Sequence, residues 1–580
     1  MDSSDHIETF DVVIVGGGIA GIAIAERLTR EAHRQGRKIR LALFEREAQL
    51  GSASSAGVEG WFHTGALYAR PQYLQTFLTC LKSFEDLVNW YTDDPLFPSR
   101  SSCRVAYSDG KGISIVPSTV SLPHANTNQR HASRRGWFDS PIQLCTIPES
   151  QDGDLCGDWH NQIASMYRTV DHIYRTASWY RKELHTCQMP SVRNLLESAG
   201  PPSRCNQNVD LCSKQLTGCD MVMHSKRIMY DLAQSASSFG AHVYLHADVQ
   251  LIETRAEDHL LHIRNARSGA IMRVQATHVI VAAGDRTIDL NSQQAMVSDN
   301  VSIQSRSSVM LVRQPAVMSE NRVIITQSEE DCVNHIYHPG TGGGISILAD
   351  ANDLPCEPSE PETQAAGHRI HAKATSMFGD TIGSFSQWSM YVCKKTEVCK
   401  LDGISRDYSY WWGPRVAHWQ NEHWQRLRQH DQAAAQDEIF NAQLTRQPPK
   451  TNCISTDVWA TTKSLHFAAL RSARQRTSQA EYDFIAVRDQ AISAFASHAT
   501  APMHSAIYVI PGKFSLFPTL AHNMYLELEL RGFFASLPTG IAQATNMADH
   551  CIASPRSVHI LRNTRNTACF GPDSLATEAK

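Results

Sequence analysis

The chain of 580 residues is longer than one hydrophobic core normally serves, which predicts two intimately joined domains with an insertion. Hydrophobic residues make up 42% and charged residues 19% of the chain, the balance of a globular rather than a disordered protein. The 54 Lys and Arg residues against 58 Asp and Glu residues give a net charge of -4, which argues against nucleic acid or an anionic membrane as a partner.

The N-terminus and the cysteines indicate the compartment. The opening MDSSDHIETF has neither the basic start nor the apolar core of a secretion signal, and no apolar run approaches the ~20 residues that cross a bilayer. The 15 cysteines form no C-x-x-C pair, so we expect reduced thiols and no metal site in a cytoplasmic protein. One segment leaves a disulfide or a metal open, because it gathers Cys145, Cys156, Cys187, Cys205, Cys212 and Cys219.

The first predicted element is a strand that runs into a glycine-rich turn. Residues 12–15 are a continuous apolar run, typical of a strand buried on both faces of a parallel sheet. Gly16, Gly18 and Gly21 follow with G-x-G-x-x-G spacing. Apolar residues then recur at helical spacing, at Ile19, Ile22, Ala23 and Leu28. The glycines therefore lie on a strand-to-helix turn.

Such a turn binds the diphosphate of a dinucleotide. Its first glycine permits the tight bend, its second lets the diphosphate approach the backbone, and its third lets helix and strand pack closely. A second predicted strand, residues 39–44, ends at Glu45, where a carboxylate accepts hydrogen bonds from a ribose diol. Both FAD and NAD satisfy this pattern, and the colour of the purified protein distinguishes them.

The stretch REAQLGSASSAGVEGWFHTGALYARP after Glu45 favours FAD. It resembles the second motif of the FAD-dependent oxidoreductases of the D-amino acid oxidase superfamily, most of all the glycerol-3-phosphate dehydrogenase and L-2-hydroxyglutarate dehydrogenase branches. The matching residues are Gly51, Ser52, Ser54, Ser55, His63, Gly65 and Tyr68. The resemblance implies bound FAD, and it places Glu45, Arg46, Ser54, Ser55, His63 and Gly65 at the cofactor.

Later blocks extend the resemblance. A helix from about residue 223 and the strand that follows it return the chain to the FAD domain in this superfamily, with Val249 beside the adenine. THVIVAAG, residues 277–284, resembles the last dinucleotide strand, which ends with Ala283 and Gly284 near the cofactor. IYVIPGKFSLFPTLAHN, residues 507–523, resembles the stretch that reaches the flavin pyrimidine ring, with Gly512, Lys513 and Phe514.

Lys513 has two interpretations. A helix N-terminus and a lysine at this place stabilise the negative charge that builds up at N1 and O2 of reduced flavin. The alternative is an exposed turn with a solvated lysine.

These blocks predict a mixed α/β fold: a Rossmann-like FAD-binding domain built from discontinuous segments, an antiparallel-sheet substrate domain and a partly helical insertion. The FAD-binding segments are expected at 1–116, 221–299 and 500–552. The insertion spans 117–220, the substrate or cap domain 300–499, with strands from about 300 to 420, and an irregular tail 553–580.

Patterns outside the motifs leave alternatives open. Residues 73–91 and the heptad seam of residues 159–184 predict helices. The heptad helix either packs on its own chain or docks a second subunit or a partner. An aromatic cluster either cages a substrate or packs in the core, and consists of Trp411, Trp412, Trp419 and Trp424. Three residues of one predicted strand are pocket candidates or surface groups: His335, Tyr337 and His338.

The predicted chemistry is the oxidation of a C–H bond next to a hydroxyl, in a hydroxy acid or polyol phosphate, by hydride transfer to flavin N5. His63 is the candidate base, because an imidazole titrates near ~6.5. A structural or flavin-contact role, or a covalent link to the flavin, is the alternative. Arg286 either grips a substrate carboxylate or phosphate or serves solvent or FAD.

Other function classes remain open at this stage. The same fold also oxidises C–N bonds, so an amine or amino-acid oxidase is an alternative. A further one is a non-catalytic or redox-sensing flavoprotein that acts through a partner complex. A small-molecule substrate and an electron acceptor of unspecified identity are the expected partners.

Overall fold

The computed structural model describes most of the segments expected to bind the cofactor and most of the strands of the two large sheets. The described residues are 7–63, 104–108, 112–116, 137–146, 214–255, 257–287, 290, 301–325, 332–339, 343–400, 405–406, 410–412, 506–510, 513–530, 532–545, 560–561 and a few between 67 and 91.

The first sheet has eight strands, and its main path runs β19-β20-β11-β1-β2-β8. Four of its pairings are parallel: β1 with β2, β1 with β11, β11 with β20 and β2 with β8. The strands of this sheet are β1 (Glu8–Val15), β2 (Leu41–Phe44), β8 (His242–Tyr244), β9 (Ala247–Thr254), β10 (His259–Asn265), β11 (Ile271–Val281), β19 (Tyr410–Trp412) and β20 (Ile507–Ile510).

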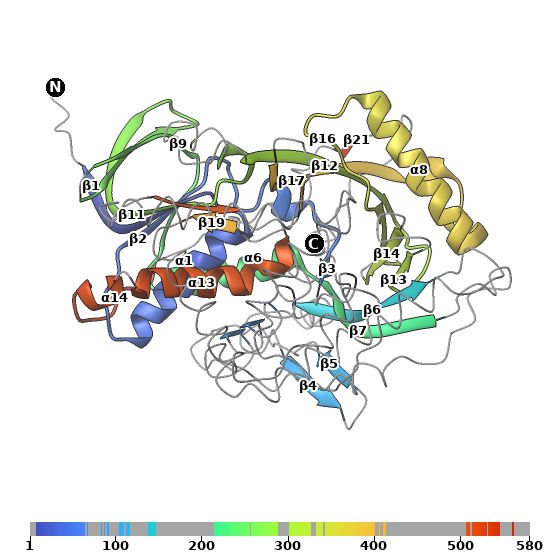
Figure 1. The fold of residues 1–580 in the computed structure, drawn as a ribbon, viewed down its shortest axis with the longest axis horizontal. Helices are drawn as coiled ribbons and strands as arrows, with labels where there is room; N and C mark the ends of the chain where they lie inside the picture. Colours follow the sequence, from blue (N-terminus) through green and yellow to red (C-terminus); the bar gives the residue numbers. More distant parts are fainter. Residues whose placement is uncertain are drawn as a thin grey trace, which may run out of the picture.

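Successive side chains of β1 point to opposite faces of the sheet and belong to two different hydrophobic cores. Val12 and Ile14 pack with three helices on one face of the sheet, whereas Val13 and Val15 pack with the β9–β10 hairpin on the other. The helices are α1 (Ile19–Arg34), α6 (Ser225–Ser238) and α13 (Phe517–Leu530), and Figure 1 shows them side by side below the sheet. The short helix α14 (Phe533–Ser536) follows α13. Burial on both faces explains why β1 is apolar throughout.

The second sheet has eleven strands and its main path runs β18-β17-β12-β15-β14-β13-β6-β7-β3. The long strands β12 and β17 pair antiparallel over nearly their whole length. The strands are β3 (Trp61–Phe62), β6 (Phe138–Thr146), β7 (Lys214–Met223), β12 (Val301–Arg313), β13 (Arg322–Ile325), β14 (Cys332–His338), β15 (Ile345–Asp350), β16 (Leu354–Pro355), β17 (Ser389–Lys400), β18 (Ser405–Arg406) and β21 (Ile560–Leu561).

The predicted fold class is confirmed in the part of the chain that the structure describes. Strands from distant segments build one mostly parallel sheet, and the strands expected after residue 300 build an antiparallel one (Figure 1). β6 and β7, which fall inside the range predicted as insertion, pair with each other in the second sheet. β19, inside the range predicted as substrate domain, pairs with β20 of the first sheet.

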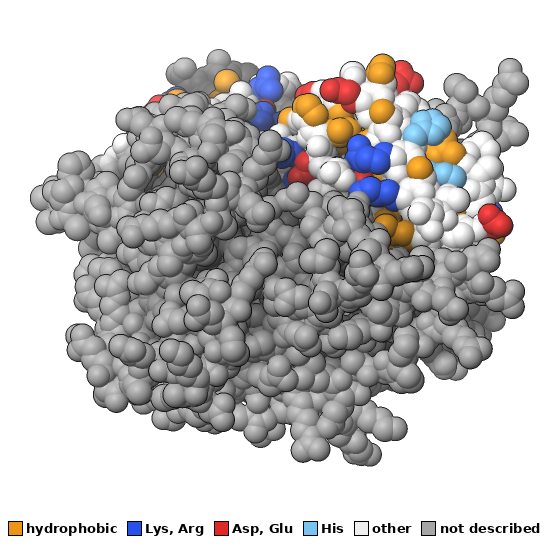
Figure 2. Space-filling model, turned by 45° about the vertical axis from the view of Figure 1, so that its right-hand side comes forward, with side chains coloured by type: hydrophobic (Ala, Val, Ile, Leu, Met, Phe, Trp, Pro, Cys, Tyr) orange, Lys and Arg blue, Asp and Glu red, His pale blue; other side chains and the backbone are white. Residues whose placement is uncertain are grey.

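One helix that packs against the second sheet was not predicted. α8 (Glu360–Phe378) begins with a capping box between Ser359 and Glu362 and packs Ile370 and Ala374 against that sheet. Two 3-10 turns follow it, η8 (Gly379–Ile382) and η9 (Phe385–Gln387). The face that carries α8 mixes basic, acidic, histidine and apolar side chains (Figure 2).

Several predictions fall outside the described residues. They include the heptad helix at 159–184, Trp419, Trp424, Gly65, Tyr68 and Gly512. β4 (Arg104–Ser108) and β5 (Gly112–Val116) form a separate two-stranded antiparallel sheet. In the described part, no helix is long and apolar enough to cross a membrane and no group of three His, Cys, Asp or Glu residues is placed to hold a metal ion.

Candidate functional site

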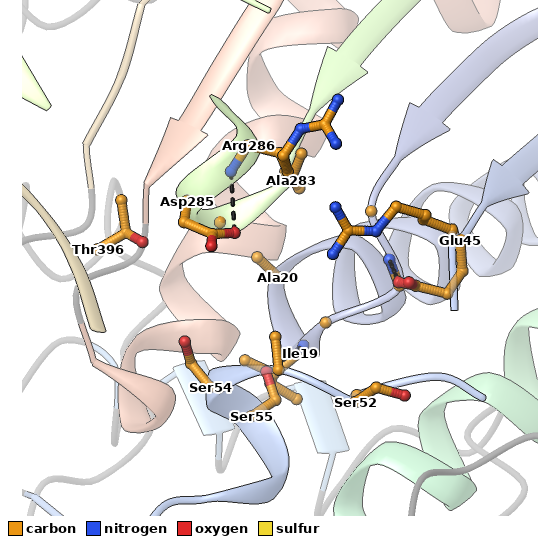
Figure 3. A pocket seen from close by; sticks show the side chains of 18 of the residues that line it. Ile19, Ala20, Glu45, Ser52, Ser54, Ser55, Ala283, Asp285, Arg286 and Thr396 are labelled. Atoms are coloured by element: carbon orange, nitrogen blue, oxygen red, sulfur yellow. Dashed lines mark hydrogen bonds between the residues drawn. The ribbon is translucent and has the colours of Figure 1, made fainter. Parts of the chain in front are cut away.

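A pocket opens where the carboxyl ends of β1, β2 and β11 meet β17 of the second sheet. Its walls come from the glycine turn, the end of β2, and two 3-10 turns, η1 (Ser54–Ala56) and η7 (Gly284–Arg286). Lys513 and Phe514, at the start of η10 (Phe514–Leu516), complete it. Figure 3 shows Glu45, Ser54 and Asp285 among the side chains around the pocket. Ligands of open α/β sheets bind at this end of the strands.

The glycine turn is shaped so that only backbone fits. Gly16 has a φ of 107°, and a Cβ on it would lie 2.4 Å from the carbonyl oxygen of Ala282. A Cβ on Gly21 would lie 1.9 Å from the carbonyl oxygen of Gly16, so α1 and β1 approach more closely than any side chain permits. Gly18 is the N-cap of α1 and lines the pocket. The cradle fits a diphosphate at a helix N-terminus.

Glu45, at the end of β2, is joined to the turn by hydrogen bonds. Its Oε2 accepts from the Gly17 N–H at 2.7 Å, and its Oε1 accepts from the Glu47 N–H at 2.8 Å. Burial raises the pKa of this carboxyl, and the two N–H donors oppose the rise. Glu45 lines the pocket at the position expected of a ribose acceptor.

The loop of the second motif lies directly beneath the start of α1. Ser55 Oγ accepts a hydrogen bond from the Ile19 N–H at 3.0 Å, and the Gly51 N–H donates to the carbonyl oxygen of Gly17 at 2.8 Å. Figure 3 shows Ser52, Ser54 and Ser55 beside Ile19 at the floor of the pocket. The two motifs, separate in sequence, therefore form one continuous wall.

Charged pairs line the side of the pocket formed by β9 and η7. Arg46 Nε lies 2.8 Å from Glu47 Oε1, and an Arg286 guanidinium nitrogen lies 3.9 Å from Asp248 Oδ1. Val249, Ala283 and Gly284 line the same region, with Gly284 at a φ of 57°. These residues are those that the resemblance places near the adenine and the end of the last dinucleotide strand.

Lys513 is buried at the other end of the pocket. Its side chain and that of Phe514 line the pocket where η10 leads into α13. Of its two interpretations, the exposed turn is excluded because Lys513 is only 9% exposed.

His63 lies just beyond β3, outside the residues that line the pocket. Its ring packs on Trp61 with centroids 4.1 Å apart and an interplanar angle of 32°. The Trp61 indole N–H donates to Asp220 Oδ2 at 2.9 Å, and Asp220 belongs to β7 of the second sheet. His63 is therefore held beside β3, at the end of the main path of the second sheet.

The strand histidines are buried in the second sheet. His335 Nδ1 lies 2.7 Å from the carbonyl oxygen of Glu320, and its Nε2 lies 2.7 Å from Ser346 Oγ. Burial lowers the pKa of His335 to about 4. His338 Nε2 bonds the carbonyl oxygen of Glu59 at 2.8 Å. Neither histidine lies on the surface, and neither lines the pocket.

Four consecutive residues of β17 line the pocket and were not predicted to do so: Cys393, Lys394, Lys395 and Thr396. The thiol of Cys393 lies 3.6 Å from the carbonyl oxygen of Ser54, and burial raises its pKa to about 12. The residue pattern within this strand does not indicate a ligand site. Only its pairing with β12 brings it to the cofactor side.

Comparison with known proteins identifies the domain. Residues 11–135 match the family model described as FAD dependent oxidoreductase. The chain carries a FAD-dependent oxidoreductase domain, and FAD is its cofactor. The part of the chain that carries the motifs at the glycine turn, Glu45 and the serine loop lies within the matched residues. A comparison with curated proteins finds no match.

Three of the solved structures to which the chain is similar are the following. Glycine oxidase from Geobacillus kaustophilus is 16% identical, over 70% of this chain and 86% of that one, with a TM-score of 0.42. FAD-bound L-α-glycerophosphate oxidase from Mycoplasma pneumoniae is 13% identical, over 69% and 86%, with a TM-score of 0.41. A FAD dependent oxidoreductase from Pseudomonas aeruginosa is 13% identical, over 95% and 98%, with a TM-score of 0.45.

Proposed function

We propose that this flavoprotein oxidises a C–H bond next to a hydroxyl in a small polar substrate of the hydroxy acid or polyol phosphate type. Bound FAD supplies the acceptor for the hydride. A hydroxyl group must also lose its proton, whereas a neutral amine is oxidised without a base. The observation that supports a hydroxyl substrate is the imidazole of His63, held against Trp61 of β3 a few residues beyond the serine loop of the pocket.

The surroundings of His63 suit a base. The side chain follows β3, only a few residues beyond the serine loop of the cofactor pocket. Its ring is oriented by the face of Trp61, and Trp61 is itself oriented by the hydrogen bond to Asp220. An imidazole in its neutral form can accept a proton from a substrate hydroxyl.

Lys513 has a separate role in this proposal. Its side chain lines the cofactor pocket next to the N-terminal end of α13. A lysine and a helix N-terminus there stabilise negative charge on the reduced cofactor. Lys513 thus supports the electron-accepting step, while His63 takes the proton.

Anaerobic mixing tests the substrate class. The purified protein is mixed with hydroxy acids, glycerol phosphate and amino acids, and the flavin absorbance is followed. We expect a hydroxy acid or glycerol phosphate to bleach the flavin. Bleaching by an amino acid alone would establish the amine or amino-acid oxidase instead, and a flavin that no candidate reduces would favour a non-catalytic flavoprotein.

The base is tested with His63→Gln and the best substrate of that screen. We expect the rate of flavin bleaching to fall ~100-fold or more, with the FAD content unchanged. In the wild type the rate should rise as the pH is raised, because only the neutral imidazole accepts the proton. His368→Gln, on the exposed side of α8, is the matched control. An unchanged rate in His63→Gln would remove His63 from the chemistry.

A further inference from the structure

The charges that line the cofactor pocket differ in where their partners lie. Arg46 pairs with Glu47, and Arg286 pairs with Asp248, and all four residues line the pocket. These two cations are therefore balanced from within the pocket wall. The lysines of β17 are arranged differently.

Lys394 and Lys395 also line the pocket, but their acidic partners lie outside its wall. The Lys394 ammonium pairs with Glu357 and that of Lys395 pairs with Asp353, 2.8 Å away, and neither acid belongs to the lining. Glu357 is 80% exposed, so its hold on Lys394 is screened by water. The pocket thus receives positive charge from two lysines whose acidic partners stand outside its lining.

The position of β17 brings this charge close to the helix start. Cys393, the residue before the two lysines, contacts the carbonyl oxygen of Ser54 at 3.6 Å. The neighbouring Ser55 accepts the hydrogen bond from Ile19 at the first turn of α1. On the other side, β17 contacts η7, where Asp285 raises the pKa of Lys394 after the larger effect of Glu357. Figure 3 shows Thr396, Asp285 and Ser54 on the side of the pocket away from Glu45.

The glycine turn by itself supplies no positively charged side chain to balance the diphosphate of FAD. The Gly17 N–H is bonded to the Glu45 carboxylate, and the Ile19 N–H is bonded to Ser55, so these two backbone donors are already engaged. The diphosphate of FAD is doubly negative, and α1 has no basic side chain in its first turn. A lysine ammonium is a compact charge that binds phosphate well.

We propose that Lys394 and Lys395 of β17 bind the FAD diphosphate, so that the second sheet contributes directly to cofactor affinity. The lysines close the pocket opposite the glycine turn and neutralise charge that the turn leaves unbalanced. This inference is independent of the substrate class, because cofactor affinity is measured without any substrate.

The test measures the dissociation constant of the full chain for FAD. We expect the double variant Lys394→Gln, Lys395→Gln to raise it at least tenfold, and Lys394→Arg with Lys395→Arg to stay within about threefold of the wild type, since charge is kept. The Gln double variant should also show a weaker dependence of affinity on salt. Lys373→Gln on α8 removes a lysine outside the pocket lining and should leave affinity unchanged.

A second variant guards against a fold defect. Glu357→Gln removes the exposed competitor for the Lys394 ammonium, so we expect FAD to bind about threefold more tightly. A Gln double variant with the affinity of Lys373→Gln would overturn the proposal. An affinity in Glu357→Gln that is unchanged or weaker would do the same, even where the double variant loses FAD by misfolding.

Discussion

The two walls of the cofactor pocket are built in opposite ways. The glycine wall is made of backbone, and its shape depends on places such as Gly16 and Gly21 where a Cβ does not fit. The β17 wall is made of side chains from a strand of the other sheet, with Cys393 against the serine loop. The first wall is complete within a short stretch of sequence, whereas the second exists only once two sheets have assembled.

The glycine wall therefore sets the shape of the pocket, and the β17 wall supplies positive charge to it. The glycine wall fixes how closely a ligand approaches the start of α1, and its polar groups are largely engaged with each other. The β17 wall leaves more freedom in shape, but it carries ammonium groups on long side chains. Substitutions on the first wall should therefore act through packing, and those on the second sheet through electrostatics.

The largest effect is expected from Gly21→Ala. The added methyl group would lie 1.9 Å from the carbonyl oxygen of Gly16, so α1 must move away from β1 and the cradle opens. We expect a loss of about 3 kcal/mol of stability and a colourless protein. Gly36→Ala is the control, since its φ is also positive, 63°, but nothing lies within 4 Å of the new Cβ. It should cost only about 1 kcal/mol and keep its flavin, as absorbance at the flavin band will show.

The glycine wall could be predicted because its physics is local. The apolar run before Gly16, the glycine spacing, Glu45 and the pair Ser54 and Ser55 all lie within one stretch, and each has a role set by its neighbours in sequence. A parallel strand, a tight turn and a helix start leave few choices of residue. These positions accordingly line the pocket in the structure.

The β17 wall could not be predicted from spacing. Lys394 reaches the pocket because β17 pairs with β12 in a register that joins Ser307 to Lys394 over a long separation in sequence. Nothing local distinguishes that lysine from a solvated one. The helix α8 is a different case, because its start carries a local signal: Ser359 and Glu362 form a capping box, and Pro361 lies in the first turn.

The stability of the second sheet should depend on pH through His335. Burial holds the pKa of His335 at about 4, below the ~6.5 of an unfolded chain. Between these values the unfolded chain binds a proton that the folded chain does not, so stability is full above pH ~6.5 and declines as pH falls toward 4. The loss should reach about 3 kcal/mol.

Urea unfolding between pH 7.5 and 4 measures this loss. His335→Gln removes the titrating group and should flatten the dependence, even if its stability is lower at every pH. The imidazole is held by Glu320 and Ser346, which makes the neutral form specific to the fold. Equal pH dependence in the wild type and the variant would show that His335 titrates normally.

Two buried tryptophans each donate a hydrogen bond from the indole N–H to an aspartate. The Trp61 indole donates to Asp220 at 2.9 Å, and the Trp137 indole donates to Asp231 at 2.8 Å. Asp231 also accepts from Arg227 Nε at 2.9 Å, so it keeps a charged donor when Trp137 is changed. We expect Trp61→Phe and Trp137→Phe each to cost about 1 kcal/mol in chemical unfolding, because each removes one buried hydrogen bond. An unchanged stability in Trp61→Phe would mean that the bond to Asp220 contributes little.

The smallest effect is expected at Arg286 of η7, which pairs with Asp248 in the pocket lining. Asp248 accepts from Arg264 at 3.1 Å and from Gln250 at 2.5 Å, so it keeps two donors when Arg286 is removed. Arg286→Ala should therefore leave the flavin content unchanged while raising the KM for an anionic substrate about tenfold. Arg264→Ala, which removes the other guanidinium at Asp248 but lies outside the pocket lining, should change neither quantity. A drop in flavin content with an unchanged KM would instead assign Arg286 to the cofactor, and would move the boundary between cofactor and substrate away from η7.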